Sequence, residues 1–157
     1  MELSSVQEEY LKTIYLLELS EGEAKVTSIA NRLNKSKASV NSAINNLNEL
    51  GLIKSEKYGP ITLTKVGNEQ ARKIVAGSDI VTLFLSEILG VEKSVAESEA
   101  TKVKNALSDE SLNKLARYTY KTLGFIQTDC GYDINNKNCF NCGVSVKVKK
   151  IINKQGK

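Results

Sequence analysis

The sequence predicts a mainly α-helical fold that contains one small β-hairpin. Three observations support this prediction. Apolar residues recur at helical spacing through most of the chain. Serine, threonine and glycine residues stand where these periodic segments begin and end, as helix caps do. Two short apolar segments flank a Gly-Pro turn at residues 59–60, which is the pattern of a hairpin.

Composition and charge indicate an ordinary globular protein. The chain has 157 residues, of which 41% are hydrophobic and 25% charged, and its formal net charge is +4. This charge permits a nucleic-acid partner without requiring one. No apolar run approaches the roughly 20 residues that span a bilayer, and the N-terminus lacks the basic-then-apolar pattern of a secretory signal. The sequence therefore predicts a cytoplasmic protein with no membrane partner.

Two absences argue against an enzyme. The chain contains no histidine, so it has no imidazole base, no imidazole metal ligand and no Ser-His pair for hydrolysis. It also lacks a glycine-rich phosphate-binding loop. We therefore predict a binding protein.

The first predicted helix begins at Ser4 or Ser5 and ends at Gly22. The segment from Ser5 to Glu8 fits a capping box, in which Glu8 bonds back to the amide of the N-cap residue. The apolar face at helical spacing consists of Val6, Tyr10, Leu11, Ile14, Tyr15 and Leu17.

Residues 26–50 are predicted to form two short helices joined by a tight turn, with Thr27 and Ser36 as N-caps and Gly51 as the stop. Both helices have an apolar face, made of Ile29, Ala30 and Leu33 in the first and Val40, Ala43, Ile44 and Leu47 in the second. Short polar or basic side chains remain exposed, the type that reaches phosphates and base edges in a major groove. This arrangement is typical of a helix-turn-helix that binds double-stranded DNA. The predicted contact residues are Thr27, Ser36, Lys37, Ser39, Asn41, Ser42 and Asn45.

A hairpin and a further helix are predicted to follow. Residues 52–56 form one strand, residues 57–60 the turn and residues 61–63 the returning strand, which together make the wing of a winged helix-turn-helix. Lys57 and Tyr58 in the turn are predicted to contact DNA, and Lys54 is a further candidate. Thr64 is the expected N-cap of the next helix.

The rest of the chain is predicted to be helical up to residue 123. Three successive apolar sets in residues 78–123 suit packing within the subunit or against a twin subunit. Residues 129–143 are predicted to form an irregular loop, and Val144–Val148 alternates like a strand. The predicted organisation is a DNA-binding domain at 1–76, a helical dimerisation domain at 77–124 and a cysteine-containing extension at 125–157.

All three cysteines, Cys130, Cys139 and Cys142, lie near the C-terminus. Cys139 and Cys142 have the C-x-x-C-G spacing of a metal knuckle, in which two thiolates face one metal. With Cys130 they suit a [4Fe–4S] cluster, with Asp129, Asp133 or another group as fourth ligand. They also suit zinc with one outside ligand, or a site completed by a partner subunit. The remaining alternatives bind no cofactor: three reduced thiols, or a redox-active Cys139/Cys142 pair.

The order of these elements resembles the diphtheria-toxin-repressor family, also called the manganese-transport-regulator family, of metal-dependent transcriptional regulators. The resemblance covers about residues 5–120. The matching segments are 8–17, 26–30 with 36–40, 51–53 with 58–59 and 63–67, 84–85 with 89–91, and 106–110. It implies a homodimer that places one recognition helix on each half-site of a palindromic operator.

The resemblance also implies where a metal site would be, and this sequence departs from it. The family binds manganese or ferrous iron between the first helix and the dimerisation helices. Glu9 stands at a ligand position, but the other matching positions are Lys12, Ser78, Thr82, Thr101, Lys104 and Asn105. A hard divalent cation needs several anionic or strongly donating ligands, so we predict a degenerate site. Lys12 or Lys104 either places an ammonium where the cation would sit, paired with Glu9 and with Asp79 as a second partner, or points to solvent.

These observations predict a homodimeric, sequence-specific DNA-binding transcriptional regulator. Its signal is expected to be iron, iron–sulfur or redox status, sensed through the C-terminal cysteines. Two alternatives stay open. One is a metal-independent DNA-binding regulator, and the other is a small iron–sulfur or electron-transfer scaffold protein that uses the helix-turn-helix for protein contacts.

Overall fold

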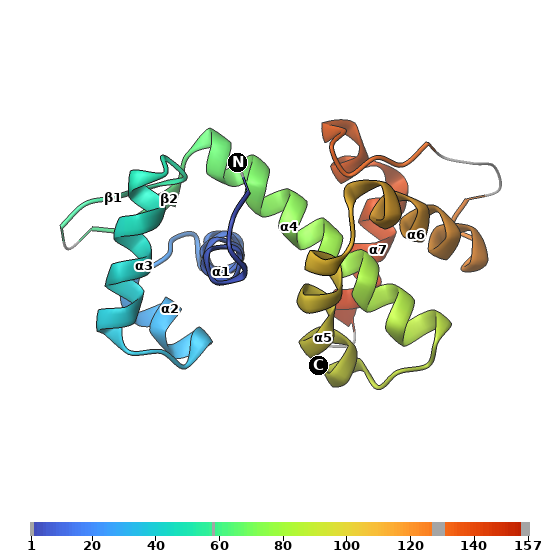
Figure 1. Ribbon diagram of the computed structural model, residues 1–157, viewed down its shortest axis with the longest axis horizontal. Coiled ribbons are helices and arrows are strands. Elements are labelled where there is room, and N and C mark those ends of the chain that lie inside the picture. Colours follow the sequence, from blue (N-terminus) through green and yellow to red (C-terminus); the bar gives the residue numbers. More distant parts are fainter. Residues whose placement is uncertain (1, 58, 127–130, 155–157) are drawn as a thin grey trace. The chain divides into compact units, whose positions relative to one another are not determined.

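The computed structural model describes residues 2–57, 59–126 and 131–154. It confirms the mainly α-helical fold, with one two-stranded sheet in this described part of the chain (Figure 1). Internal contacts divide the chain into two compact units, unit 1 at Met1–Ile74 and unit 2 at Val75–Lys157. The domain boundaries predicted at residues 76 and 124 stay predictions. No helix in the described ranges is long and apolar enough to cross a membrane.

Unit 1 opens with helix α1 (Ser5–Glu21). Ser4 is its N-cap, because the Ser4 hydroxyl accepts the Gln7 amide at 3.3 Å and the Gln7 side chain accepts the Ser4 amide at 2.8 Å. The capping box predicted between Ser5 and Glu8 was therefore wrong by one residue. Val6 is 60% exposed rather than part of the core, since it lies in the first turn, before the buried face begins at Tyr10.

Two shorter helices form the helix-turn-helix, α2 (Val26–Leu33) and α3 (Lys37–Glu49). Ser36 caps α3 as predicted, and its hydroxyl accepts the Ser39 amide at 3.1 Å. Thr27 is not the N-cap of α2: extended backbone reaches Lys25, the helix starts at Val26, and Lys25 makes no side-chain cap bond. The turn passes through Asn34 in the left-handed conformation, with φ of +51°, which asparagine tolerates well.

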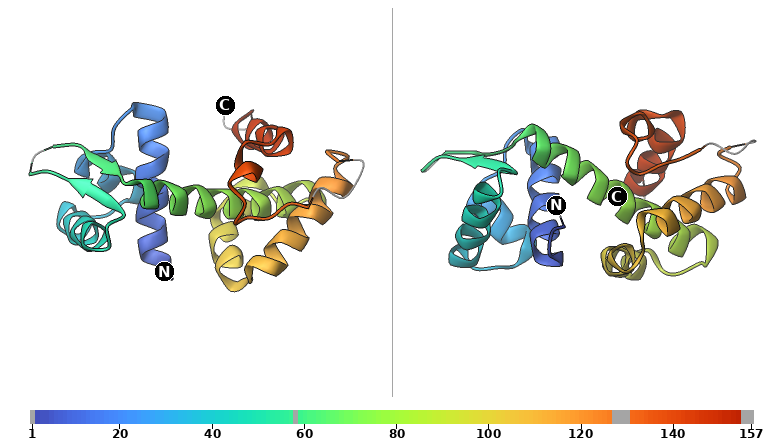
Figure 2. Two further views of the ribbon diagram at one scale, coloured as in Figure 1. Left: turned by 90° about the horizontal axis from the view of Figure 1, so that it is seen from above. Right: turned by 45° about the horizontal axis from the view of Figure 1, so that its top comes forward.

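The wing follows as strands β1 (Ile53–Ser55) and β2 (Ile61–Leu63), paired antiparallel with Lys54 opposite Thr62. Figure 2 shows this hairpin projecting from unit 1 on the side away from α1. Helix α4 (Lys65–Leu83) comes next, and Thr64 caps it as predicted by accepting the Gly67 amide at 3.0 Å. The unit 1 core is made of buried side chains from all these elements: Leu11, Ile14, Leu17, Ile29, Val40, Ile44, Leu47, Leu52, Ile53, Ile61, Ala71 and Ile74.

Gly67 marks a close contact between α4 and the wing. A methyl group on this residue would lie 1.8 Å from the carbonyl oxygen of Leu52, which directly precedes β1. Only glycine fits at such a distance from backbone. The start of α4 and the start of the wing are therefore fixed against each other.

Unit 2 contains the end of α4, a π-helical turn η1 (Phe84–Ile88), and helices α5 (Lys93–Ala106) and α6 (Asp109–Thr122). The helical stretch predicted over residues 78–123 is thus interrupted around Gly90 and Ser108. Ser108 caps α6 by accepting the Ser111 amide at 3.2 Å. The unit closes with a 3-10 turn, η2 (Lys137–Asn141), and helix α7 (Gly143–Lys154).

The strand predicted at Val144–Val148 was wrong, because this segment begins α7. The alternation of valines is short, whereas Val144, Val148, Ile151 and Ile152 repeat at helical spacing and pack on the core of unit 2. That core joins α4, α5, α6, α7 and the segment between η2 and α6. Its buried members are Ile80, Val81, Leu83, Ala100, Leu112, Ala116, Tyr120, Tyr132, Ile134 and Val148.

Candidate nucleic-acid interface and effector sites

The exposed face of α3 carries the polar residues that the sequence singled out. Val40, Ile44 and Leu47 are buried on the opposite face and hold the helix against unit 1. Ser36, Lys37, Ser39, Asn41, Ser42 and Asn45 are all exposed. Packing therefore fixes the orientation of α3 and leaves one continuous polar face free for a ligand.

Some of these polar side chains already form hydrogen bonds within the protein and others do not. The Ser36 and Ser39 hydroxyls lie 2.9 Å apart and bond to each other at the cap. Within the described residues, the side chains of Lys37, Asn41, Ser42 and Asn45 make no hydrogen bond or ion pair, so their donors and acceptors face solvent. An ammonium and two amides of this kind can contact phosphates and base edges.

The wing adds a smaller and mixed set. Lys54 on β1 and Lys57 at the turn are exposed, but Glu56 beside them is exposed too. Tyr58 lies outside the described residues. Thr27 is exposed in the first turn of α2, where it has no capping role.

Three of the positions that resemble family metal ligands cluster in unit 2. Ser78 and Thr82, one turn apart on α4, are only 2% and 6% exposed. The Ser78 hydroxyl lies 3.4 Å from the Thr101 hydroxyl on α5, and the two form a hydrogen bond. Lys104, one turn further along α5, runs past Gly77, where an added methyl would lie 3.0 Å from Lys104 Cγ. Asn105 is exposed.

This cluster does not fit a divalent cation. Its donors are three hydroxyl groups, of which those of Ser78 and Thr101 already bond to each other, beside an ammonium-bearing side chain, and none is a carboxylate. Over the described residues, no group of three His, Cys, Asp or Glu side chains is placed to hold a metal ion. Glu9 and Lys12 lie on α1 in unit 1, Glu9 exposed and Lys12 half-buried.

The described cysteines, Cys139 and Cys142, stand at the junction of η2 and α7, both as half-buried free thiols. Cys130 lies outside the described residues, so the three-cysteine cluster stays a prediction. Asp133 is not a free ligand, since its carboxylate accepts the Asn113 side chain at 3.2 Å and the Asn135 amide at 2.9 Å.

Cys142 is tied to the start of α7 through Ser145. Its sulfur accepts the Ser145 amide at 3.5 Å and donates to the Ser145 hydroxyl at 3.4 Å, while that hydroxyl donates to the Cys139 carbonyl. Burial acts to raise the pKa of Cys142, but the hydrogen bonds from Ser145 and from nearby backbone amides outweigh it. The pKa of the Cys142 thiol therefore lies below its ordinary value.

Tyr132 lies behind these thiols. It lines a cavity of about 20 Å³ together with Asp79, Tyr120, Phe140, Ser145 and Lys149. Burial raises the pKa of Tyr132, and negative charge on Cys139, Cys142 and Asp79 raises it further. The phenol is thus neutral at physiological pH.

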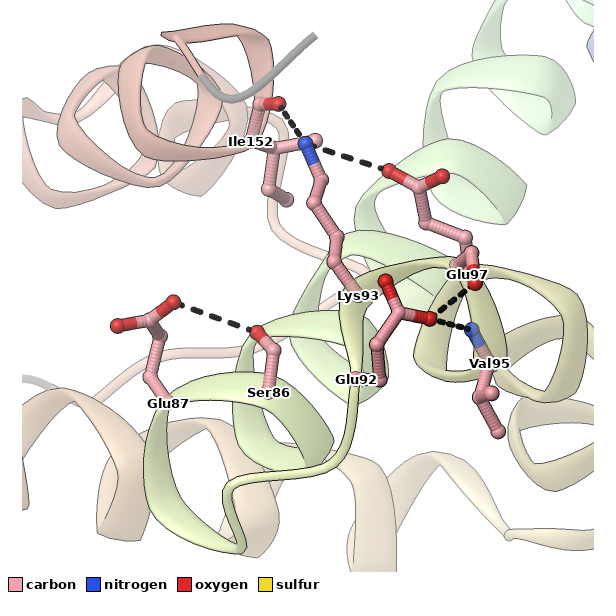
Figure 3. Close-up of polar contacts among 8 residues, drawn as sticks. Ser86, Glu87, Glu92, Lys93, Val95, Glu97 and Ile152 are labelled. Carbon is pink, nitrogen blue, oxygen red and sulfur yellow. Dashed lines mark hydrogen bonds and ion pairs between the residues drawn. The ribbon is translucent and has the colours of Figure 1, made fainter.

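The far end of α7 is held by a lysine that sequence reasoning missed. Lys93, at the start of α5, donates to the Ile152 carbonyl at 2.9 Å and pairs with Glu97 at 3.4 Å (Figure 3). A cation suits the carbonyl end of a helix. No spacing in the sequence links residues 93 and 152, so only the fold reveals this contact.

Comparison with known proteins connects both units to one family. Residues 2–61 match a family described as "Iron dependent repressor, N-terminal DNA binding domain". Residues 64–133 match "Iron dependent repressor, metal binding and dimerisation domain". The two matches meet at the wing and α4, so they cover most of both units.

Individual relatives agree with this. An uncharacterised helix-turn-helix-type transcriptional regulator of Methanocaldococcus jannaschii is 37% identical over 120 residues, which is 76% of this chain and 96% of that protein. The regulator MntR of Lysinibacillus sphaericus is 28% identical over 69% of this chain and 78% of its own length. The crystal structure of IdeR from T. acidophilum is 25% identical, with a TM-score of 0.65 over 79% of this chain. The match covers 55% of that IdeR chain, about half its length.

Proposed function

The chain belongs to the iron-dependent repressor family of transcriptional regulators, and on this premise we propose that it is a homodimer that binds a palindromic DNA operator without a divalent metal. The observation that carries the DNA-binding part is the exposed face of α3, where Lys37, Asn41, Ser42 and Asn45 make no internal polar contact in the described structure.

DNA binding is tested by its salt dependence. Duplexes are selected from a randomised pool with the full chain, and binding to the enriched duplex is followed by fluorescence anisotropy. Lys37→Ala is expected to reduce the salt slope by about 2, because the homodimer loses one phosphate contact in each half-site. Asn41→Ala is expected to weaken binding about tenfold and to relax specificity, as loss of a base contact does. Lys114→Ala, an exposed lysine of unit 2, is the charge-matched control.

The dimer is proposed for unit 2, which matches the family's dimerisation domain. Large apolar side chains remain exposed on its surface in the single chain, namely Leu89, Val95, Val103 and Tyr118. Covering them against a second copy stabilises the pair by apolar burial. Light scattering on the reduced protein is expected to give the mass of a dimer, and the mass of a monomer at micromolar concentration would contradict this part.

Independence from a divalent metal is proposed because the Ser78–Thr101 hydroxyl pair and Lys104 occupy the positions that match the family's ligands. DNA affinity is expected to be the same in EDTA and in excess manganese. Equilibrium dialysis supplies the second measurement. Tight stoichiometric manganese binding that disappears in Glu9→Ala would overturn the proposal that the metal site is degenerate.

The controlling signal is proposed to enter through the cysteines of unit 2. The support is the placement of Cys139 and Cys142 at the junction that starts α7, a helix packed on the core of the same unit. A [4Fe–4S] cluster or zinc needs a further ligand, such as Cys130, whereas thiol chemistry needs only the described pair. Anaerobic purification followed by iron, zinc and sulfide analysis distinguishes an iron–sulfur cluster, a zinc site and metal-free thiols.

The same samples test the scaffold alternative. A small iron–sulfur or electron-transfer protein would show a bound cluster and no salt-dependent binding to the selected duplex. A regulator shows the steep salt slope whether or not a cluster is present.

A further inference from the structure

We propose that Cys139 and Cys142 form a redox-reactive dithiol, in which Cys142 is the attacking thiol and the start of α7 is the segment that oxidation releases. Its regulatory consequence rests on the proposed function, whereas the chemistry of the site does not.

The backbone brings the two cysteines within disulfide range. Cys139 lies inside η2 and Cys142 directly follows it, so they are three residues apart across one 3-10 turn. Such a turn advances roughly 6 Å, and disulfides join Cα atoms about 4.4–6.8 Å apart. Both thiols are free and half-buried, which leaves each open to a small oxidant while shielding it from bulky ones.

The surroundings assign the attacking role to Cys142. Its sulfur stands at the N-terminus of α7 and accepts the amide of Ser145 there. Backbone amides and the positive end of a helix dipole stabilise a thiolate. The Ser145 hydroxyl connects the two cysteines, because it contacts both the Cys142 sulfur and the Cys139 carbonyl. These contacts hold the two residues in a fixed relative position.

The oxidant we assign is a peroxide. The Cys142 thiolate attacks one peroxide oxygen, the O–O bond breaks, and the products are Cys142 sulfenic acid and, after protonation, water. The Cys139 thiol then attacks the Cys142 sulfur, the S–O bond breaks, and a second water leaves. Overall, two thiols and one hydrogen peroxide give one disulfide and two waters, with sulfur oxidised and oxygen reduced.

Oxidation would act on α7 because Cys142 holds its first turn. In the disulfide the sulfur is neutral and drawn toward Cys139, so the Ser145 amide loses a thiolate acceptor. The far end of the helix remains held by Lys93 on α5 (Figure 3). The first turns of α7, which carry Val144 and the buried Val148 into the core beside Tyr132, are therefore the part that loosens.

The test treats the reduced, metal-free full chain with equimolar hydrogen peroxide, blocks remaining thiols with N-ethylmaleimide and maps peptides by mass spectrometry. We expect one peptide with Cys139 and Cys142 joined, two hydrogens lighter, in the wild type and equally in Cys130→Ser. In Cys139→Ser, dimedone should label Cys142 as the sulfenic acid. Amide exchange in the first turn of α7 should rise roughly fivefold on oxidation, as loss of one N-cap implies.

Three results would overturn the inference: a disulfide that uses Cys130 or joins two chains, no dimedone label on Cys142 in Cys139→Ser, or no loss of thiols in the wild type. Binding of the reduced sample to the selected duplex is measured in parallel. DNA binding without the disulfide refutes this inference alone, and the disulfide without DNA binding refutes the proposed function alone.

Discussion

Replacing Gly67 with alanine should loosen the wing from α4. The added methyl would lie 1.8 Å from the Leu52 carbonyl oxygen and 2.8 Å from its carbonyl carbon, whereas non-bonded heavy atoms pack best at about 3.5–4.0 Å. The neighbour is backbone, and it is held by Thr64. The Thr64 amide donates to the same Leu52 oxygen at 3.0 Å, and the Thr64 hydroxyl donates to the adjacent Gly51 carbonyl at 2.7 Å, with the Leu52 oxygen at 3.1 Å.

The magnitude follows from the two ways the chain can respond. If α4 stays in place, overpacking costs about 3 kcal/mol. If α4 moves away, the two hydrogen bonds from Thr64 are lost at about 1 kcal/mol each. Alanine returns about 1 kcal/mol of helix propensity. We therefore expect unit 1 to lose about 1–2 kcal/mol of unfolding free energy.

Urea unfolding of the full chain by circular dichroism measures this loss. Because two units need not unfold together, amide exchange across Ile53–Ser55 and the first turn of α4 localises it. Gly143→Ala is the matched control, since Gly143 is also in the first turn of a helix and an added methyl there meets nothing within 4 Å. Gly67→Ala with the stability of wild type would refute the close contact between α4 and Leu52.

Three further pairs of variants, each a test with its control, probe the helix caps, the Lys93–Ile152 contact and the Cys142 thiol. Ser36→Ala should cost about 1 kcal/mol through loss of the α3 cap, while Thr27→Ala should be neutral in the same urea titration; equal effects would contradict the observed caps. Lys93→Met should cost about 1–2 kcal/mol by removing the donor to Ile152, whereas Lys114→Ala, which breaks an exposed pair with Glu110, should leave the urea midpoint unchanged. Because the pKa of Cys142 is lowered, its alkylation by iodoacetamide should persist at pH values where an ordinary thiol is already protonated. Ser145→Ala should move the midpoint of that pH profile upward and Ser98→Ala should not; coincident profiles for wild type and Ser145→Ala would remove Ser145 from the explanation.

Local chemistry in the sequence was enough to predict most of unit 1. Ser36 and Thr64 cap helices because each precedes an apolar period and has a side-chain oxygen within reach of an amide three residues on. One incorrect prediction in this unit also concerns local chemistry, because the capping box of α1 was placed one residue too late. Two serines stand side by side at the start of α1, and Ser4 with Gln7 makes the box that Ser5 with Glu8 also permits.

The C-terminal part was harder to predict because its structure depends on tertiary contacts. Val144 to Val148 alternates over five residues, which fits a strand as well as a helix until Ile151 and Ile152 complete the helical face. The anchor from Lys93 to Ile152 joins residues far apart in sequence. The need for glycine at Gly67 likewise arises from the neighbouring Leu52 carbonyl, which no local pattern contains.

For the candidate sites, the sequence was enough to predict which residue types are present. It was not enough to predict which of these side chains already form hydrogen bonds within the protein. The exposed polar set of α3 follows from helical periodicity, but only the structure shows that Ser36 and Ser39 bond to each other while Lys37 and Asn41 face solvent. In the same way, the C-x-x-C spacing indicated paired thiols, and the fold then revealed that Ser145 connects them.

The outer edge of β2 bears on how this protein avoids aggregation. An unpaired strand edge is a template on which another chain can add a strand. Here the Ile61 amide donates to the Ala24 carbonyl at 2.9 Å, and the Leu63 amide donates to the Glu18 carboxylate at 2.8 Å. Both amides therefore form hydrogen bonds within unit 1, one to a main-chain carbonyl and one to the Glu18 side chain. A regulator concentrated along DNA can thus carry an exposed hairpin without offering this edge to its neighbours.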